Sequence, residues 1–364
     1  MAVVVSQRLS EFLRAAGASA ADIEQAEDNG WLPVLALDRL LMPGAPVHDL
    51  DSLAEHSGVE GDRLARIWRA LGFPDVPAGL ELFSEQDLEA VRRLAGTATG
   101  AVGGLRRALG ESETPARIIS AALSRIAAYE VELFAAGLDD LRNAGLDDDA
   151  AALAMLDDFE WDDLAWFIDY IHRLQLRAAA WRRLTTSTAS GGLELGVGFV
   201  DLSGYTELSE ELDDRGLAEL LDQFEVVVGD TVAQLGGRVV KTIGDEIMFV
   251  GPGDAVASIA LTILDRAHGI EELPSVRIGV SFGPVLARGG DYFGPVVNLA
   301  SRITDRARPG SILAAEAVHD LLDGDARFSF RPLAPRRIRG IGPVRLFALR
   351  GPRRTEAIEP SHSG

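Results

Sequence analysis

The hydrophobic pattern of the chain changes near residue 190. Before that point, apolar residues recur at helical spacing among Ala, Leu, Glu and Arg, with little strand-like alternation. After it, short β-branched and aromatic runs alternate with helical stretches. The pattern predicts an all-helical domain over residues 1–184, a polar hinge at 185–192, an α+β domain over 193–350 and a flexible tail at 351–364.

The first half reads as a series of helices. The predicted helical segments are Ser10–Ala16, Ser19–Asn29, Leu50–Leu71, Glu113–Ala136, Asp147–Met155 and Trp161–Leu184. Apolar residues of the last segment follow a helical period, and a polar run comes directly after it. This segment is either a lever between a sensor and an output domain or simply the last helix of its domain.

The segment Leu50–Leu71 has the pattern of a helix–turn–helix, with Gly58 at the turn. It loosely resembles the DNA-binding helices of MerR-type regulators. Its acidic and basic residues are mixed, however, and the whole chain carries a net charge of −21, which opposes binding to nucleic acid. A packing hairpin is therefore the favoured interpretation, and we expect no nucleic-acid partner.

The second half predicts a βαββαβ order, which is that of ferredoxin-like folds. The predicted elements are Leu195–Val200 (strand), Glu211–Leu235 (helix), Arg238–Thr242 and Glu246–Val250 (hairpin), Asp254–His268 (helix) and Val276–Ser281 (strand). In this topology the third strand lies between the first and second. Asp201 ends the first strand and Asp245 lies in the hairpin turn, so the fold brings the two carboxylates together. Such a pair can hold divalent ions for phosphoryl chemistry.

Three further features could bind a nucleotide. A Ser-Gly turn after Asp201 leads into a helix, and loop N–H groups there favour anions. Asn298 and Arg302 are spaced i and i+4 on one helix face, and an arginine can fork onto a phosphate. A last predicted hairpin over Phe328–Arg350 carries arginines near Gly340 that either reach phosphates or form ordinary surface.

Composition sets the expected compartment. The 364-residue chain contains no cysteine, which excludes disulfides and thiolate metal sites and fits a cytoplasmic protein. No apolar run has the length that a membrane span requires, and the start of the chain lacks the features of a signal peptide.

Three segments, FVDLSGYTEL, KTIGDEIMF and DYFGPVVNLASRI, together resemble the catalytic domain of the class III nucleotidyl cyclases over about residues 193–349. The resemblance implies a ferredoxin-like cyclase domain that works as a homodimer, with ATP sites shared between protomers and two Mg²⁺ or Mn²⁺ ions in each. The implied metal ligands are Asp201, Asp245 and the carbonyl of Leu202. The implied substrate contacts are the phosphate loop Ser203, Gly204, Tyr205 and Thr206, the adenine-reading pair Lys241 and Asp291, the transition-state residues Asn298 and Arg302, and Arg339 at the terminal phosphates.

The chemistry implied is attack of the ribose 3′-hydroxyl on the α-phosphorus, giving 3′,5′-cyclic AMP and pyrophosphate. A lysine donates to a ring nitrogen of adenine and a carboxylate accepts from its amino group, so Lys241 and Asp291 favour ATP over GTP.

The helical half also resembles the regulatory domain of a soluble, pH-responsive mycobacterial adenylyl cyclase. This resemblance implies autoinhibition that acid relieves. His172 in the last helix is a candidate proton switch, since histidine titrates near neutral pH; a small lipid is a second candidate regulator.

Three other functions compete with the cyclase interpretation. A diguanylate cyclase shares the core but expects a Gly-Gly-[Asp/Glu]-Glu-Phe hairpin, which Ile243–Ile247 lacks. A transcription regulator would use Leu50–Leu71, and a binding scaffold would sense nucleotide without turnover. The full set of site residues argues against the scaffold.

Overall fold

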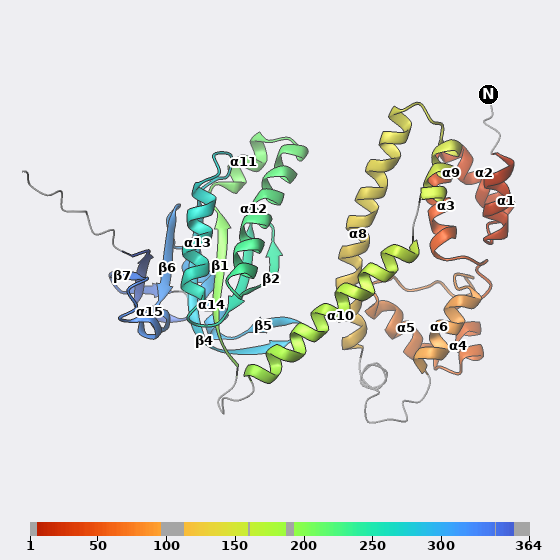
Figure 1. Cartoon of the computed structure of the whole chain (residues 1–364). Helices are drawn as coiled ribbons and strands as arrows, with labels where there is room; N and C mark the ends of the chain where they lie inside the picture. Colours follow the sequence, from red (N-terminus) through yellow and green to blue (C-terminus); the bar gives the residue numbers. More distant parts are fainter. Residues whose placement is uncertain (1–5, 96–112, 159–160, 187–192, 339, 353–364) are drawn as a thin grey trace, which may run out of the picture. The chain divides into compact units, whose positions relative to one another are not determined.

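The computed structural model describes residues 6–95, 113–158, 161–186, 193–338 and 340–352 (Figure 1). The chain divides into two compact units, residues 1–172 and 173–364. Helix α10 (Trp161–Thr186) continues through that division. Residues 187–192 of the predicted hinge and 353–364 of the predicted tail lie outside the described residues. Within the described ranges, no helix combines the length and apolar character needed to cross a bilayer.

The first unit is helical, as predicted. Its elements are α1 (Gln7–Ala15), α2 (Ala20–Asn29), α3 (Leu32–Leu41), α4 (Leu50–Ser57), α5 (Gly61–Ala70), α6 (Glu85–Ala95), α8 (Thr114–Asn143), α9 (Asp148–Asp158) and the first half of α10. Local signals set several ends. Ser19 and Asp22 form a reciprocal capping box at the start of α2, and Gly30 ends that helix in the left-handed conformation.

Two separate hydrophobic clusters hold this unit together. One joins α1, α2, α3 and α9 around Leu9 and Leu13, which are fully buried. The other joins α4, α5 and α6 around Leu53, Phe83 and Leu88. The predicted helix–turn–helix is therefore present as α4 and α5, with its apolar side packed against α6.

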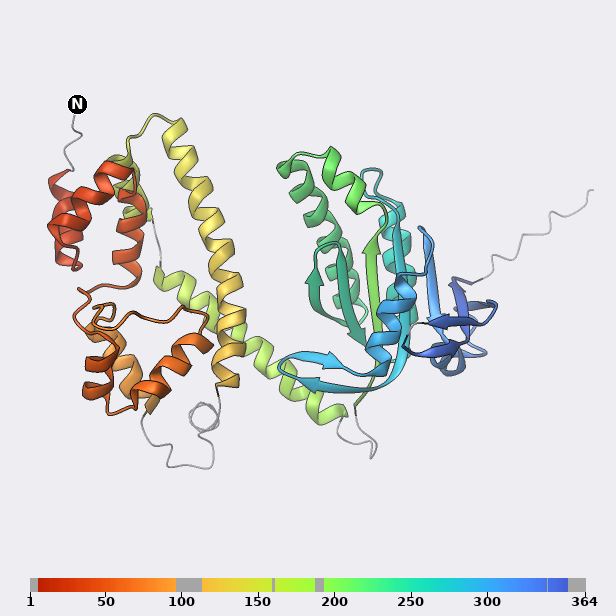
Figure 2. The ribbon, with the colours of Figure 1, turned by 180° about the vertical axis from the view of Figure 1, so that it is seen from behind.

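The second unit is built on one eight-stranded sheet (Figure 2). Its strands are β1 (Leu193–Leu202), β2 (Arg238–Ile243), β3 (Glu246–Gly251), β4 (Val276–Arg288), β5 (Asp291–Phe293), β6 (Ser311–Ala315), β7 (Ser329–Pro332) and β10 (Leu346–Arg350). Strands β8 (Arg336–Ile338) and β9 (Gly342–Val344) form a separate two-stranded sheet. Its helices are α11 (Tyr205–Glu211), α12 (Asp214–Gln234), α13 (Val256–His268), α14 (Pro295–Thr304) and α15 (Glu316–Leu322).

The strand order is β2-β3-β1-β4-β6-β10-β7, with β5 paired to β4. Strand β3 lies between β1 and β2 and is antiparallel to both, as the ferredoxin-like arrangement predicts. The main core lies between the sheet and helices α12 and α13, where Phe224, Phe249 and Ile259 are fully buried. On the other face, α14 covers Val197, Phe199 and Met248 in a smaller cluster.

Three predicted boundaries in this unit differ from the structure. The helix expected over Glu211–Leu235 begins three residues later, as α12, because the Asp213 side chain accepts from the Gly216 N–H and caps the start of that helix; the preceding helix α11 ends at Glu211. Strand β4 runs to Arg288 and turns into β5, whereas the sequence pattern predicted an end at Ser281. The last segment contains four short strands instead of a single hairpin.

Candidate active site

The two predicted acids lie together at one edge of the sheet. Asp201 is the penultimate residue of β1, just before the chain leaves the sheet, and Asp245 is in the tight turn between β2 and β3. The Leu202 N–H donates to the Asp245 carbonyl at 3.3 Å, which fixes the turn against the end of β1. Burial raises the pKa of Asp201 above its ordinary value, and the neighbouring Asp245 carboxylate raises it further.

An arginine that the sequence analysis did not select faces Asp201. Arg277 lies on β4 directly opposite Asp201 in the β1–β4 register, and its Nε donates to Asp201 Oδ2 in an ion pair. This ion pair lowers the pKa of Asp201 and so opposes the effect of burial. The sequence did contain a signal for this residue, since it is a lone arginine at the start of an apolar strand. A charged side chain on a largely buried strand needs a partner of opposite charge.

A third acid lies beside these two. Glu246 begins β3 and pairs with Asp201 across the β1–β3 ladder. Burial and the negative charges of Asp201, Asp305 and Asp245 raise the pKa of Glu246 to about 7, and Arg277 acts in the opposite direction. Arg277 is thus the cation at the centre of several carboxylates.

The two residues of the predicted base-reading pair also contact each other. Lys241 on β2 and Asp291 on β5 form an ion pair with Nζ 2.5 Å from Oδ2, although 50 residues separate them in sequence. The Tyr292 N–H donates to the second Asp291 oxygen at 2.7 Å. A donor and an acceptor therefore lie next to each other, both about one-third exposed.

A β-bulge determines which face Lys241 occupies. The β2–β3 register shifts between Val239 and Lys241, so Val239 pairs with Phe249 but Lys241 pairs with Met248. Paired residues share a sheet face, and Met248 belongs to the α14 side. Without the extra residue, strict alternation would turn Lys241 toward α12, away from Asp291.

Helix α14 carries the predicted transition-state residues. Val297, Ala300, Ile303 and Thr304 form its buried face, whereas Asn298 and Arg302 are exposed. The turn after β8 comes close to Arg302, because a β-carbon on Gly340 would stand 4.0 Å from Arg302 Nη2. Arg339, predicted at the terminal phosphates, lies outside the described residues.

The predicted phosphate loop follows β1 directly. The Ser203 N–H donates to the Ser275 carbonyl at 2.8 Å, while its hydroxyl is buried and has no hydrogen-bond partner in the described chain. Gly204 has a positive φ of 81°, which lets the chain turn into α11. Tyr205 packs on the main core and Thr206 is exposed.

The donor set fits hard divalent cations. Asp201, Asp245 and the Leu202 carbonyl are all oxygen donors at one edge of the sheet, and Mg²⁺ commonly uses one or two protein carboxylates plus substrate phosphates. Among the described residues, no group of three or more His, Cys, Asp or Glu side chains is arranged to hold a metal ion. A set of two carboxylates and one carbonyl is suited to ions that substrate phosphates help to bind.

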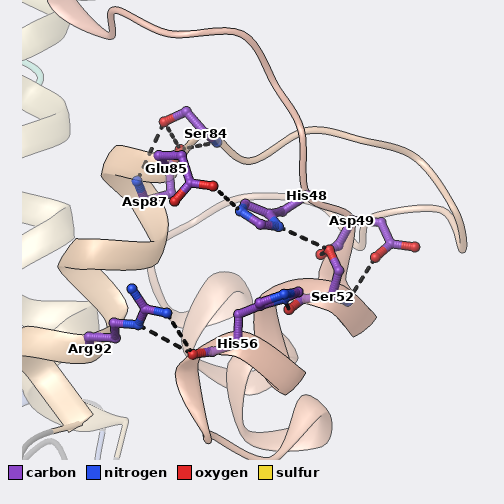
Figure 3. Close-up of polar contacts among 8 residues, drawn as sticks. All are labelled: His48, Asp49, Ser52, His56, Ser84, Glu85, Asp87 and Arg92. Carbon is purple, nitrogen blue, oxygen red and sulfur yellow. Dashed lines mark hydrogen bonds and ion pairs between the residues drawn. The ribbon is translucent and has the colours of Figure 1, made fainter.

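The structure separates the predicted regulatory histidine from a histidine pair that the sequence analysis did not select. His172 is exposed on α10. His48, by contrast, is buried between α4 and α6: Nε2 lies 3.0 Å from Glu85 Oε1, and Nδ1 lies 3.3 Å from Ser52 Oγ (Figure 3). The His56 ring stands 5.3 Å from it. This cluster ties the helix–turn–helix to α6.

Comparison with known proteins identifies the family to which the chain belongs. Residues 192–351 match the family described as the adenylate and guanylate cyclase catalytic domain. An adenylate cyclase of Streptomyces coelicolor (strain ATCC BAA-471 / A3(2) / M145) is 31% identical over 339 residues, covering 85% of this chain and 87% of that protein. The chain therefore belongs to the class III adenylate and guanylate cyclases.

Two further similarities concern parts of the chain. A pH-sensitive adenylate cyclase of Mycobacterium tuberculosis (strain CDC 1551 / Oshkosh) is 36% identical over 191 residues, covering 50% of this chain and 48% of that protein. The crystal structure of the adenylyl cyclase CyaB from P. aeruginosa is 26% identical, covers 44% of this chain and 95% of that chain, and superposes with a TM-score of 0.39.

Proposed function

We propose that this protein converts ATP to 3′,5′-cyclic AMP and pyrophosphate at sites shared between two copies of the chain, under control of its helical unit. The observation that carries the proposal is the convergence of Asp201 and Asp245 at one sheet edge, next to a loop whose Ser203 hydroxyl is buried without a partner in the described chain.

Asp201, Asp245 and the Leu202 carbonyl would hold two divalent ions. When bound, such ions supply Lewis-acid stabilisation of the phosphoryl oxygens and lower the pKa of the attacking hydroxyl. Arg277 already lies against Asp201, so it orients this carboxylate and offsets the repulsion from Glu246 and Asp245.

The other roles fall to residues on the α14 side. Lys241 and Asp291 would read the base; the proposal is supported by their proximity, since a lysine can donate to a ring nitrogen of adenine and a carboxylate can accept from its amino group. Asn298 would position the ribose, and Arg302 would stabilise charge on the transferring phosphoryl group. Both residues are exposed on α14, which suits a site that a second copy completes.

The test is cyclic AMP formation by the purified chain from ATP or GTP, with Mg²⁺ or Mn²⁺. Wild-type protein should use ATP in preference to GTP, and Asp245→Asn should lose nearly all activity. Asp265→Asn, an exposed acid on α13, is the matched control and should leave activity unchanged. Product formation by Asp245→Asn at the wild-type rate would disprove the assigned site.

Regulation by pH is the second part of the proposal. It is supported by the similarity to a pH-sensitive adenylate cyclase. Full-length chain should show lower, acid-stimulated activity across pH 5.5 to 8, compared with a chain that starts near Gly191. If His172 is the switch, His172→Ala flattens the profile, whereas an unchanged profile removes this residue from the mechanism.

A further inference from the structure

Helix α8 presents a continuous apolar stripe that nothing in the described chain covers. It is the longest helix of the first unit, with 30 residues (Figure 1). Its packed side carries Ala116 and Leu138, which are buried, and Ser120, whose hydroxyl donates to the Leu71 carbonyl. A different side carries large apolar residues that remain solvent-exposed.

The exposed residues follow a seven-residue repeat. Ile119, Ile126 and Leu133 are spaced seven apart, and three residues after each comes Ala122, Tyr129 or Ala136. We call these six residues the α8 seam. All six are exposed, and Tyr129 and Leu133 are 61% and 56% exposed. A repeat of this kind, with apolar positions a and d, is the pattern by which one helix packs against another.

Charge along α8 identifies the partner helix. Arg117 and Arg125 lie in its first half, whereas its second half carries four acids and one arginine, Arg142, which forms ion pairs with Asp139 and Asp148. The four acids are Glu130, Glu132, Asp139 and Asp140. Two copies of α8 in antiparallel orientation would place the basic half of each copy beside the acidic half of the other copy. A parallel pair would instead place like charges beside each other. A two-fold axis makes such a contact self-complementary and closed.

We propose that the α8 seam binds the α8 seam of a second copy of this chain in antiparallel orientation. In this arrangement the two-fold axis passes between residues 127 and 128, and Ile126 packs against Tyr129 of the second copy. Outside the seam, Arg125 lies near Glu132 of the second copy.

The size of the stripe indicates how the contact is used. The exposed apolar side chains of the seam, with Ile118 and Leu123 beside it, amount to on the order of 500 Å² per copy. A stable interface usually buries about 800 Å² per partner. The seam is therefore too small to hold two copies together alone, and it acts together with the dimer contact of the catalytic unit, which raises the effective concentration of one seam near the other. In this respect the inference rests on the proposed function.

Because the chain has no native cysteine, single cysteine substitutions report this geometry cleanly in the full-length protein. In the antiparallel pair, the two copies of position 126 lie about 5 Å apart along the helix axis, whereas the two copies of position 119 lie about 26 Å apart. A short bismaleimide should therefore cross-link Ile126→Cys into a covalent dimer but not Ile119→Cys. Val131→Cys, which replaces a residue outside the seam that is more exposed than Ile126 (57% against 40%), is the control for chance collisions.

Cross-linking of both Ile126→Cys and Ile119→Cys would indicate a parallel pair and overturn the antiparallel arrangement. If Ile126→Cys cross-links no more than Val131→Cys does, the seam contact itself is overturned. A second measurement supports the first: Ile126→Glu should raise the dissociation constant of the full-length dimer at least tenfold, and Val131→Glu should not. Cyclase activity measured on the same samples separates the two hypotheses, because loss of cross-linking with intact activity refutes the seam alone.

Discussion

Gly279 on β4 is a position at which the sheet and helix α14 approach very closely. A β-carbon built there would lie 2.4 Å from Thr304 Oγ1, 2.5 Å from the Thr304 nitrogen and 2.6 Å from the Ala300 carbonyl oxygen. Two of these are backbone atoms, so no side-chain rotation relieves the clash. Gly279→Ala would therefore push α14 away from the sheet by about 1 Å to restore ordinary contact distances.

The displacement matters because α14 carries Asn298 and Arg302. Overpacking of this kind destabilises a protein by about 1–3 kcal/mol. A shift of about 1 Å in groups that position substrate lowers activity by on the order of a hundredfold. We therefore expect Gly279→Ala to remain folded, with a lower urea midpoint and a much larger loss in cyclic AMP formation than in stability.

The assay compares initial rates at saturating ATP with urea unfolding curves for the same preparations. Gly229→Ala on α12 is the matched control, since a β-carbon there meets nothing within 4 Å and alanine favours the helix. Adding Thr304→Ala to Gly279→Ala should recover little, because the backbone contacts remain. Activity of Gly279→Ala within about threefold of wild type would refute the assigned role of this contact.

Three other contacts give predictions of their own. Arg277→Met should lower activity by at least about tenfold, since it leaves Asp201 beside other carboxylates without a counter-charge, and isothermal titration with Mn²⁺ should show altered metal affinity. Lys241→Ala should raise KM for ATP more than it lowers kcat, and should reduce the preference for ATP over GTP in a competition assay. Hydrogen bonds from the Ser19 backbone and hydroxyl hold the pKa of Asp22 below its ordinary value. The charged Asp22 side chain therefore stabilises the folded state fully when the pH is above the ordinary pKa, and this stabilisation is lost as the pH falls through the lower pKa of the folded protein. Asp22→Ala should therefore lower the thermal midpoint at pH 7, and the difference from wild type should shrink in acid.

Sequence alone placed much of the candidate site because its geometry is dictated by topology. Once the βαββαβ order is read, strand β3 must lie between β1 and β2, and the turn holding Asp245 must lie beside the end of β1 that carries Asp201. The shared face of Asn298 and Arg302 likewise follows from helical periodicity. These are local or order-determined relations, so no knowledge of packing was required to predict them.

Other features depended on contacts between distant segments. The bulge that turns Lys241 toward Asp291 has no sequence signature, because one extra residue in a β-branched strand leaves the pattern of apolar residues intact. The pairing of Arg277 with Asp201 required the β1–β4 register, which a strand pattern alone does not set.

The exposure of the α8 seam was equally hidden from sequence. An apolar stripe on a helix is usually a core face, and only the packed structure shows that α5 and α9 contact a different side. The sequence thus determined which residues are candidates for the chemistry and in which order the strands pair. The tertiary structure decided which charges face one another and which apolar surface is left uncovered, because both depend on long-range register and on what is already packed.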